Sequence, residues 1–171
     1  MIVGKFLRNI KAQLSIIGEK FSRLWFNYIY QSFFAAVVIF TLLMVLNMQR
    51  LVVVASMGAT SFIVFAMPKS ITSEPRRIIG GHLIGLATGA LTAVFLPHTS
   101  MVISVIAYSA AVAGAMFLMV ALDAEHPPAG GTALGIAISG WSLKIMLVII
   151  ISVIVLSAAH VLLKKYMKDL V

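Results

Sequence analysis

The sequence has no cysteine, few acidic residues and little charge of either sign. Among 171 residues, 5 are Asp or Glu, 13 are Lys or Arg, and 11% are charged. Without cysteine, disulfides, thiolate catalysis and cysteine-ligated metals are excluded. An ordinary soluble domain is also excluded, because about 25% of its residues would be charged. The chain is instead 61% hydrophobic with a mean hydropathy of +1.08, which indicates an integral membrane protein.

Long apolar runs make up most of the chain. A helix needs about 20 apolar residues to cross roughly 30 Å of hydrocarbon. Stretches of about that length cover residues 31–49, 51–68, 78–100, 101–122 and 145–163. These runs predict an all-α integral membrane fold, because a spanning helix satisfies its backbone hydrogen bonds internally.

Residues 1–29 form a distinct N-terminal region. Apolar residues recur there at helical spacing with basic residues between them, which predicts an amphipathic helix on the membrane surface. The apolar positions are Ile2, Phe6, Leu7, Ile10, Leu14, Ile17 and Phe21. Trp25, Tyr28 and Tyr30 follow as interfacial anchors. We therefore expect an interfacial helix over residues 1–29 and a transmembrane domain over residues 30–171.

Basic residues beside the apolar segments predict the topology. Lys69, Arg76 and Arg77 follow the second segment, and further lysines follow the last one. The positive-inside rule then places the N-terminus, this loop and the C-terminus in the cytoplasm, at a cytoplasmic (inner) membrane. Contact with anionic lipid accounts for the net charge of +8 without nucleic acid. An even number of crossings is required, so residues 127–141 would form a short sixth crossing; if they are re-entrant, five remain.

A weak internal repeat favours six crossings. Gly58-Ala59-Thr60 and Gly130-Gly131-Thr132 lie 72 residues apart, and the same shift carries residues 31–48 onto residues 103–120. Each half then contains a long helix, a short Gly-interrupted helix and a long helix. Halves of three crossings have opposite orientations, so the pattern predicts a 3+3 inverted repeat of the kind found in transporters.

Two blocks of sequence resemble a known family of membrane proteins. His126-Pro-Pro followed by Ala-Gly-Gly-Thr-Ala-Leu134 is similar to the signature that names the HPP family. Ser56-Met-Gly-Ala-Thr-Ser61, Pro75-Arg76 and Gly80-Gly-His82 are similar to the family's other shared block. Together the matches span residues 50 to 163. Plastid and cyanobacterial members are described as nitrite transporters, so the resemblance implies a helical membrane fold and transport of nitrite or another small anion.

The two Gly-rich motifs suit the binding of an anion. They combine hydroxyl donors with backbone that no side chain covers, and a helix starting after each motif would add its positive dipole end. The candidate substrate-binding residues are Ser56, Gly58, Thr60, Ser61, Gly130, Gly131 and Thr132. The alternative is that these small residues let helices pack closely.

Two histidines are candidates for gating or proton coupling. His126 has Asp123 and Glu125 beside it, and a histidine near a carboxylate titrates near neutral pH. His82 lies inside the third segment, where a titratable residue is costly and often functional. The alternatives are that His126 caps a helix and that His82 donates one hydrogen bond to a neighbouring helix.

Other residues carry structural expectations. Gly81, Gly85 and Gly89 are spaced by four, which predicts a face that packs against another helix. His160 lies at a segment end, where we expect it to be solvated and without a role. Arg76 and Arg77 satisfy the positive-inside rule and could also draw an anion to the cytoplasmic mouth.

These features favour a membrane transporter of a small inorganic anion, with nitrite as the leading substrate and proton coupling through the histidines. We expect no enzymatic activity, cofactor or metal site, because nucleophile and metal-ligand patterns are absent. A chain of this size favours a homo-oligomer. One alternative is a non-transporting membrane module that assembles with another subunit. A second is a channel for a cation or neutral solute, suggested by Asp123 and Glu125.

Overall fold

The computed structural model describes residues 2–46, 51–96 and 100–171, and these ranges consist of helices joined by short connections. The helices are α1 (Ile2–Leu46), α2 (Leu51–Ala66), α3 (Pro75–Phe95), α4 (Met101–Ala121), α5 (Pro128–Ser139) and α6 (Leu143–Leu163). Two short 3-10 helices, η1 (Ile71–Ser73) and η2 (Lys164–Tyr166), follow α2 and α6. By length and composition, α1, α3, α4 and the α6–η2 region qualify as membrane spans. The expected all-α membrane fold is confirmed.

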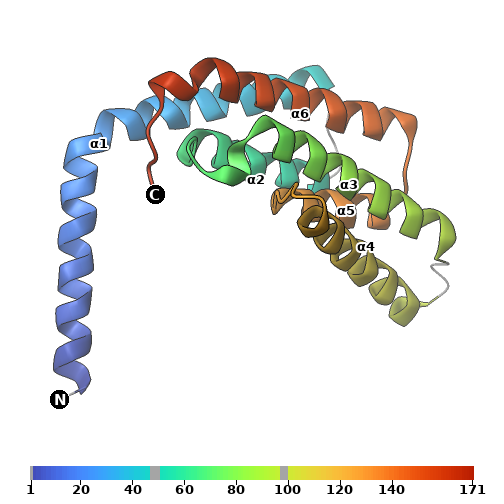
Figure 1. Cartoon of the computed structure of the whole chain (residues 1–171), viewed down its shortest axis with the longest axis horizontal. Helices are drawn as coiled ribbons and strands as arrows, with labels where there is room; N and C mark the ends of the chain where they lie inside the picture. Colours follow the sequence, from blue (N-terminus) through green and yellow to red (C-terminus); the bar gives the residue numbers. More distant parts are fainter. Residues whose placement is uncertain (1, 47–50, 97–99) are drawn as a thin grey trace.

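Helix α1 is continuous across the boundary expected at residue 29. Its 45 residues give a length of about 68 Å, far more than the roughly 30 Å of hydrocarbon that a span must cross. Figure 1 shows that the N-terminal part turns away from the bundle, nearly at right angles to the second part. Side chains at 5–19 are all exposed, so this part of α1 packs on no other described helix.

Three connecting segments meet at one end of the molecule. The backbone N–H of Leu170 donates to the carbonyl of Ala66 at 2.8 Å, which ties the C-terminus to the end of α2. His126 Nδ1 lies 2.8 Å from the carbonyl oxygen of Thr72, which ties the α4–α5 connection to the α2–α3 connection. Since these segments share an end, α5 and the three residues after it must return the chain to the other end before α6 begins.

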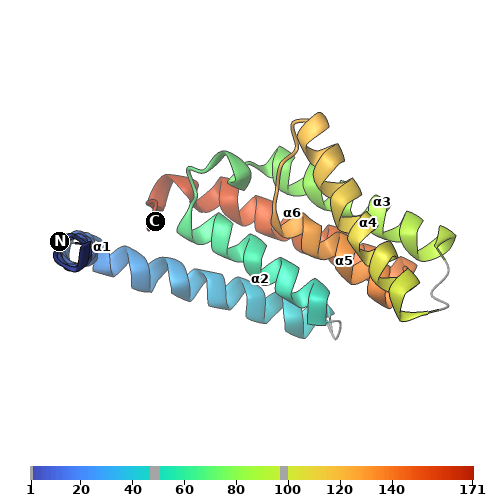
Figure 2. The ribbon, with the colours of Figure 1, turned by 90° about the horizontal axis from the view of Figure 1, so that it is seen from below.

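The two short helices have the lengths that this path requires. At 1.5 Å per residue, the 16 residues of α2 and the 12 residues of α5 extend about 24 Å and 18 Å, so neither crosses a full hydrocarbon layer by itself. Figures 1 and 2 show α5 close to α3 and α4, and α5 also contacts α2. Its surroundings are therefore mostly protein.

Local sequence sets the ends of these helices. Pro128 occupies the first position of α5, where a missing N–H costs nothing. Gly140, with φ of 74°, ends α5 in a backbone conformation that glycine adopts without strain. Helix α2, by contrast, runs straight through Gly58. The expectation that a helix begins after Gly58 is wrong, because one glycine between strongly apolar turns costs only about 1 kcal/mol and does not break a helix.

The described interior contains two different cores. One consists of large side chains from α1, α2, α3 and α6, including Leu42, Met57, Phe65, Ile149 and Leu156. The other joins α4 to α5 almost entirely through alanine: Ala111, Ala115, Ala129, Ala133 and Ala137, with Met119. Small side chains let backbones approach closely, so α5 meets α4 by close contact, while its Ile136 packs into the first core.

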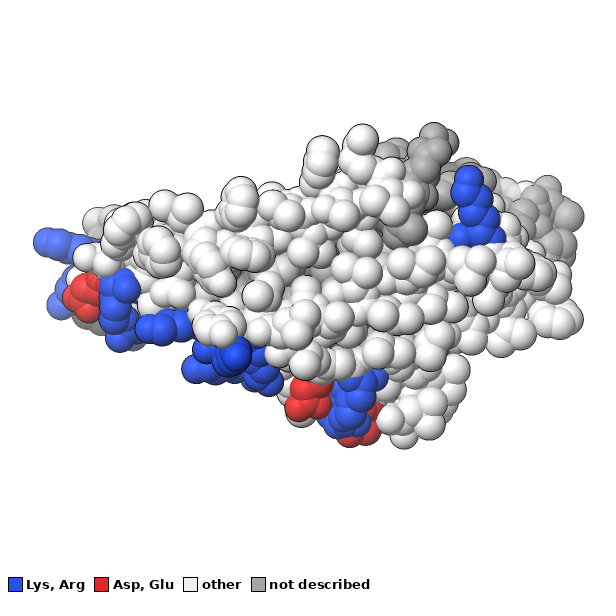
Figure 3. Space-filling view, turned by 90° about the horizontal axis from the view of Figure 1, so that it is seen from above, with Lys and Arg blue, Asp and Glu red and all other residues white. Residues whose placement is uncertain are grey.

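The charged side chains of the described residues lie toward the ends of the helical body on the face that Figure 3 draws. Figure 3 shows Lys and Arg along one margin of the molecule, with the Asp and Glu side chains beside them and a broad uncharged surface over the centre. Among the described residues seen in this view, a single basic group lies at the opposite end. An uncharged belt between charged margins is the surface expected for a protein that crosses a bilayer.

Candidate functional site

Five buried polar side chains gather where α2, α3 and α5 meet. They are Ser56 and Thr60 from α2, His82 from α3, His126 from the segment before α5, and Thr132 from α5; we call them the polar cluster. Each is at most 3% exposed. Because unpaired polar groups are costly in an apolar interior, such a cluster must be hydrogen-bonded internally.

The side chains of the polar cluster form an unbroken chain of contacts. Ser56 Oγ lies 2.8 Å from Thr132 Oγ1, and Thr132 Oγ1 lies 2.8 Å from His82 Nδ1. His82 Nε2 lies 2.9 Å from Thr60 Oγ1, which lies 3.0 Å from His126 Nε2. Hydroxyl and imidazole groups alternate along most of this chain, and each of them can donate or accept a hydrogen bond.

Backbone carbonyl groups lie at the ends and at one branch of this chain. Ser56 Oγ lies 2.6 Å from the carbonyl oxygen of Pro128, and His126 Nδ1 lies 2.8 Å from that of Thr72. Thr60 Oγ1 also lies 3.0 Å from the carbonyl oxygen of Ser56. A carbonyl only accepts, so the hydrogen of each terminal bond comes from the cluster.

Glycines on α3 bring the cluster together. A Cβ on Gly81 would lie 2.7 Å from His126 Cβ, and one on Gly89 would lie 2.6 Å from the carbonyl oxygen of Ala133. A Cβ on Gly85 would collide with the carbonyl oxygen of Ala129. The predicted helix-packing face is confirmed, and its partner is α5. The approach of α3 to α5 is what places His82 against Thr132.

The seven predicted binding residues do not all lie in the cluster. Gly58 is exposed, and a Cβ there would meet nothing within 4 Å. Ser61 is buried on α2, with no hydrogen-bond partner for its Oγ among the described residues. A Cβ on Gly131 would lie 3.3 Å from Ser56 Cβ, whereas one on Gly130 would meet Val112 at 3.9 Å. Only Gly131 therefore borders the cluster closely.

The first backbone N–H groups of α5 already have partners. The N–H of Ala129 donates to the carbonyl of His126 at 2.8 Å, and the N–H of Gly130 donates to that of Pro127 at 3.0 Å. We expected the backbone N–H groups beside Gly130 to be free donors. For the N–H of Gly130 this expectation is wrong, because α5 begins at Pro128, before the motif. The donors at the site are side chains.

Asp123 and Glu125 lie among arginines instead of against the His126 ring. Asp123 binds Arg76 at 2.7 Å and also pairs with Arg77, and Arg77 pairs with Glu125. The Arg76 guanidinium, through its hydrogen bond, and Arg77 lower the pKa of the Asp123 carboxyl. These pairs join α3 to the α4–α5 connection at a charged margin, where both arginines are held by acids.

The backbone at Asp123 closes helix α4. Its φ is 52°, a left-handed conformation that Asp tolerates better than most residues. The N–H of Ala124 donates to the carbonyl of Met119 at 2.8 Å, and the N–H of Asp123 donates to that of Val120 at 3.3 Å. This is a Schellman arrangement, which turns the chain toward the two prolines that start α5.

The sequence patterns did not mark His160 or Gln31 as buried polar side chains. His160, expected to be solvated, is 2% exposed, and its Nε2 lies 2.9 Å from the carbonyl oxygen of Pro68. Gln31, also buried, donates from Nε2 to the carbonyl groups of Phe65 and Lys168 and accepts from the Lys168 N–H at 3.0 Å. The available sequence signal for Gln31 was its polar amide at the start of an apolar stretch. Both side chains hold backbone segments at the charged margin.

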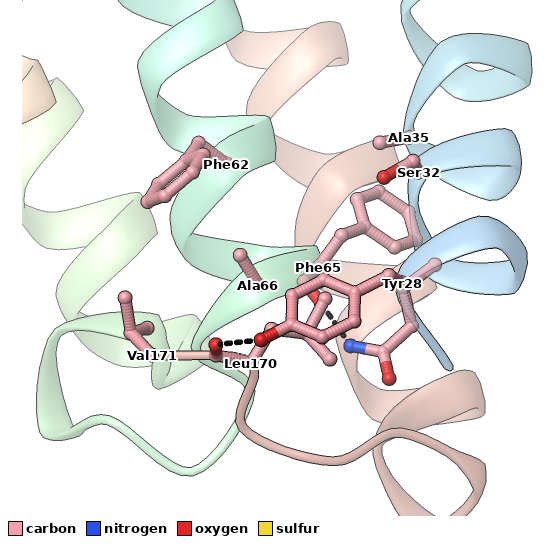
Figure 4. Close-up of a pocket in the computed structure, with 9 residues that line it drawn as sticks. Tyr28, Ser32, Ala35, Phe62, Phe65, Ala66, Leu170 and Val171 are labelled. Carbon is pink, nitrogen blue, oxygen red and sulfur yellow. Dashed lines mark hydrogen bonds between the residues drawn. The ribbon is translucent and has the colours of Figure 1, made fainter. Parts of the chain in front are cut away.

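Gln31 lies beside a hollow at the C-terminal segment, residues 167–171. Figure 4 shows Tyr28, Phe62, Phe65 and Leu170 around this hollow, with the Tyr28 hydroxyl donating to the carbonyl of Leu170. Its volume is about 260 Å³. A second hollow, of about 90 Å³, touches His82 and is otherwise lined by apolar side chains of α3 and α6. The second one lies next to the polar cluster.

The geometry defines a class of protein, a helical membrane domain with a buried polar interface. Comparison with known proteins supports this class. The transmembrane region that characterises HPP proteins matches residues 21–169, so the chain belongs to the HPP family. Two Dictyostelium discoideum proteins, each named as a transmembrane protein, are 36% and 30% identical over 89 residues. The matches cover 52% and 50% of this chain but only 31% and 27% of those proteins. No solved structure matches the chain.

Proposed function

We propose that this protein moves a small inorganic anion across the membrane, with nitrite as the leading substrate. The observation that carries the proposal is the polar cluster, five hydrogen-bonding side chains buried between α2, α3 and α5. Polar and ionisable side chains in the membrane interior are costly and commonly mark a pathway. We choose nitrite because plastid and cyanobacterial members of the same family are described as nitrite transporters.

The chemistry of the cluster favours an anion over a cation. Ser56, Thr60 and Thr132 carry hydroxyl donors, and each imidazole carries an N–H. The acids nearest in sequence, Asp123 and Glu125, are already paired with Arg76 and Arg77. A cation would need free oxygen ligands at the cluster, whereas an anion needs donors. Hydroxyl and N–H donors bind a small anion without burying a permanent countercharge.

Transport requires the cluster to open, because its side chains contact one another in this closed arrangement. The contact of Ser56 with Thr132 joins the two short helices α2 and α5. We propose that these helices belong to two inverted halves, α1–α3 and α4–α6, each with the order long, short, long. Rocking of inverted halves about a central site is a common route to alternating access. An anion between α2 and α5 would replace the Ser56–Thr132 contact.

The orientation follows from charge. Lys164, Lys165 and Arg76 lie at the end of the molecule that also contains the C-terminus. By the positive-inside rule, we place this end and the N-terminal part of α1 in the cytoplasm. His126 then lies toward the cytoplasmic side of the cluster, since it binds Thr72 in the connection between α2 and α3.

Uptake by liposomes tests the proposed function. Purified protein should give saturable nitrite uptake above that of empty liposomes, with nitrate and chloride as competing anions. Thr132→Val should reduce uptake about tenfold or more, because a buried partner left unsatisfied costs about 1–3 kcal/mol. Thr88→Val is the matched control. Thr88 is also buried on a helix, but its hydroxyl donates to the carbonyls of Ile84 and Gly85 in its own helix.

The possible outcomes of this uptake experiment lead to different conclusions. Loss of uptake in Thr132→Val with normal uptake in Thr88→Val supports a site at the polar cluster. Uptake no greater than in empty liposomes, from protein that is folded and monodisperse, rejects anion transport by this chain alone. Co-purification of a stoichiometric second protein in that case would favour a membrane module that works with another subunit.

A further inference from the structure

The polar cluster contains more hydrogen-bond contacts than it has donor hydrogens while both of its histidines are neutral. Seven contacts of 3.0 Å or less link its five side chains to one another and to three carbonyl groups. Three hydroxyls and two neutral imidazoles supply one hydrogen each, which makes five. Carbonyl groups supply none, so two contacts lack a hydrogen while both rings are neutral.

Thr60 is where this shortage matters most. Its single hydroxyl hydrogen has three neighbours, the Ser56 carbonyl oxygen, His82 Nε2 and His126 Nε2. His126 Nδ1 faces the Thr72 carbonyl and must donate to it. The Nε2 of a neutral His126 is therefore an acceptor, and Thr60 is the neighbour that can donate to it. In the neutral protein the Thr60 hydrogen points to His126.

A proton on His126 Nε2 reverses this arrangement. The protonated ring donates to Thr60 and to the Thr72 carbonyl together, and the Thr60 hydroxyl turns to the Ser56 carbonyl. His82 stays neutral throughout, donating from Nε2 to Thr60 and accepting at Nδ1 from Thr132. One added proton therefore fills one more contact without moving a heavy atom. Addition of a second proton would place two charged rings with centroids 5.1 Å apart, which mutual repulsion opposes.

The surroundings offer that proton little other compensation. Helices α2 and α5 contain no Asp, Glu, His, Lys or Arg, and the side of α6 against His82 is apolar. From the α2–α3 and α4–α5 connections, Glu74, Asp123 and Glu125 face Arg76 and Arg77, and Lys69 lies at the C-terminal segment. His160 lies beyond Ser73. A charged His126 is thus unpaired unless an anion enters the cluster.

We infer that His126 carries a proton together with each transported anion and that the Thr60 hydroxyl is the switch between the loaded and unloaded states. The inference rests on the proposed function. One proton and one monovalent anion leave the cluster without net charge, which removes most of the cost of holding either in the membrane. The proton enters from the aqueous phase with the anion, is shared between His126 Nε2 and Thr60 Oγ1, and leaves on the other side.

Simultaneous measurement of nitrite and internal pH in the same liposomes tests this inference. A trapped pH dye reports protons, and a chemical assay reports nitrite, with empty liposomes correcting for leakage of nitrous acid. The wild-type protein should take up equal numbers of protons and nitrite ions. His126→Gln keeps one donor and one acceptor but holds no proton, so its remaining nitrite flux should bring in no protons. His160→Gln should keep the wild-type ratio.

The possible results distinguish failure of the proton-coupling inference from failure of the proposed anion transport. Nitrite uptake without protons in the wild type overturns the inference and leaves anion transport standing. Folded protein that moves neither rejects the proposed function itself. Should His126→Gln fail to fold, ¹⁵N NMR of histidine rings in the wild-type protein gives the second readout. Nitrite should increase the imidazolium form of His126 alone, and a ring spectrum that nitrite leaves unchanged overturns the inference.

Discussion

The polar cluster and the contacts of the C-terminal segment bury the same kinds of side chain in different ways. Gln31 binds backbone groups of α2 and of the C-terminal segment, and His160 nearby lies against the Pro68 carbonyl with the Ser73 hydroxyl at 3.2 Å. The backbone groups have fixed roles as donor or acceptor. In the polar cluster, hydroxyls and imidazoles bind mainly one another. A backbone partner allows one hydrogen pattern, whereas side-chain partners allow several.

This difference separates anchoring from activity. Gln31 fixes the C-terminal segment to α1 and α2 with three hydrogen bonds, and none of them can reverse direction. The cluster can change its hydrogen pattern without moving heavy atoms. We therefore expect changes at Gln31 to alter stability and changes in the cluster to alter transport.

The largest effect is expected where α3 meets α5. Gly85→Leu adds a Cβ that collides with the Ala129 carbonyl oxygen, so the two helices must separate and the cluster must come apart. Overpacking of this kind costs about 1–3 kcal/mol or more, and we expect little folded protein. Size-exclusion profiles and melting temperatures in detergent measure this. Gly58→Leu is the control, since a Cβ there meets nothing; equal losses in both variants would contradict the account.

Loss of Gln31 should destabilise the protein without changing its transport chemistry. Gln31→Leu leaves the Phe65 and Lys168 carbonyl groups without this donor, which costs about 1–3 kcal/mol. The melting temperature should fall, while nitrite uptake per folded molecule and its ratio to protons should stay at wild-type values. Abolished uptake in well-folded Gln31→Leu would show that the C-terminal contacts belong to the transport machinery.

A smaller effect is expected at the edge of the cluster. Gly131→Ala places a Cβ 3.3 Å from Ser56 Cβ, whereas Gly130→Ala meets only Val112 at ordinary distance. The first variant should lower nitrite uptake several-fold by displacing Ser56 from Thr132, and the second should leave it nearly unchanged. Initial uptake rates at matched protein density compare the two. A larger loss of uptake in Gly130→Ala than in Gly131→Ala would indicate that the site lies closer to α4.

The smallest effect is expected at the charged margin. Asp123→Asn keeps a residue that tolerates positive φ but removes the charge that Arg76 and Arg77 bind. Because these arginines lower the pKa of Asp123, its contribution to stability is present above the ordinary carboxyl pKa and is lost as pH falls through the lowered one. The wild-type and Asp123→Asn melting temperatures should therefore differ slightly at neutral pH and converge in acid. A constant difference would contradict this.

Much of the helical framework could be predicted from the sequence. Apolar length and periodicity located the spans, and the Gly81, Gly85 and Gly89 spacing identified a packing face, because both signals are local. The continuous path of α2 through Gly58 was not predicted, since flanking apolar residues outweighed the local effect of one glycine. The N–H groups beside Gly130 were expected to be free because a helix was expected to begin after the motif, whereas α5 begins at Pro128.

The candidate site was only partly predictable. His82, His126, Thr60 and Thr132 were each selected from sequence, yet contacts spanning 22 to 66 residues join them, and no local pattern determines such pairings. His160 was expected to be solvated from its place near a segment end. Its burial depends on the fold of the distant α2–α3 connection, which lies against it.

The most direct test of the account compares nitrite uptake by Thr60→Val and Gln31→Leu at equal amounts of folded protein in liposomes. Thr60→Val keeps the shape of the side chain but removes the hydroxyl that both cluster histidines contact. We predict loss of saturable uptake in Thr60→Val and wild-type uptake in Gln31→Leu. Normal uptake by folded Thr60→Val would contradict the claim that the polar cluster is the transport site.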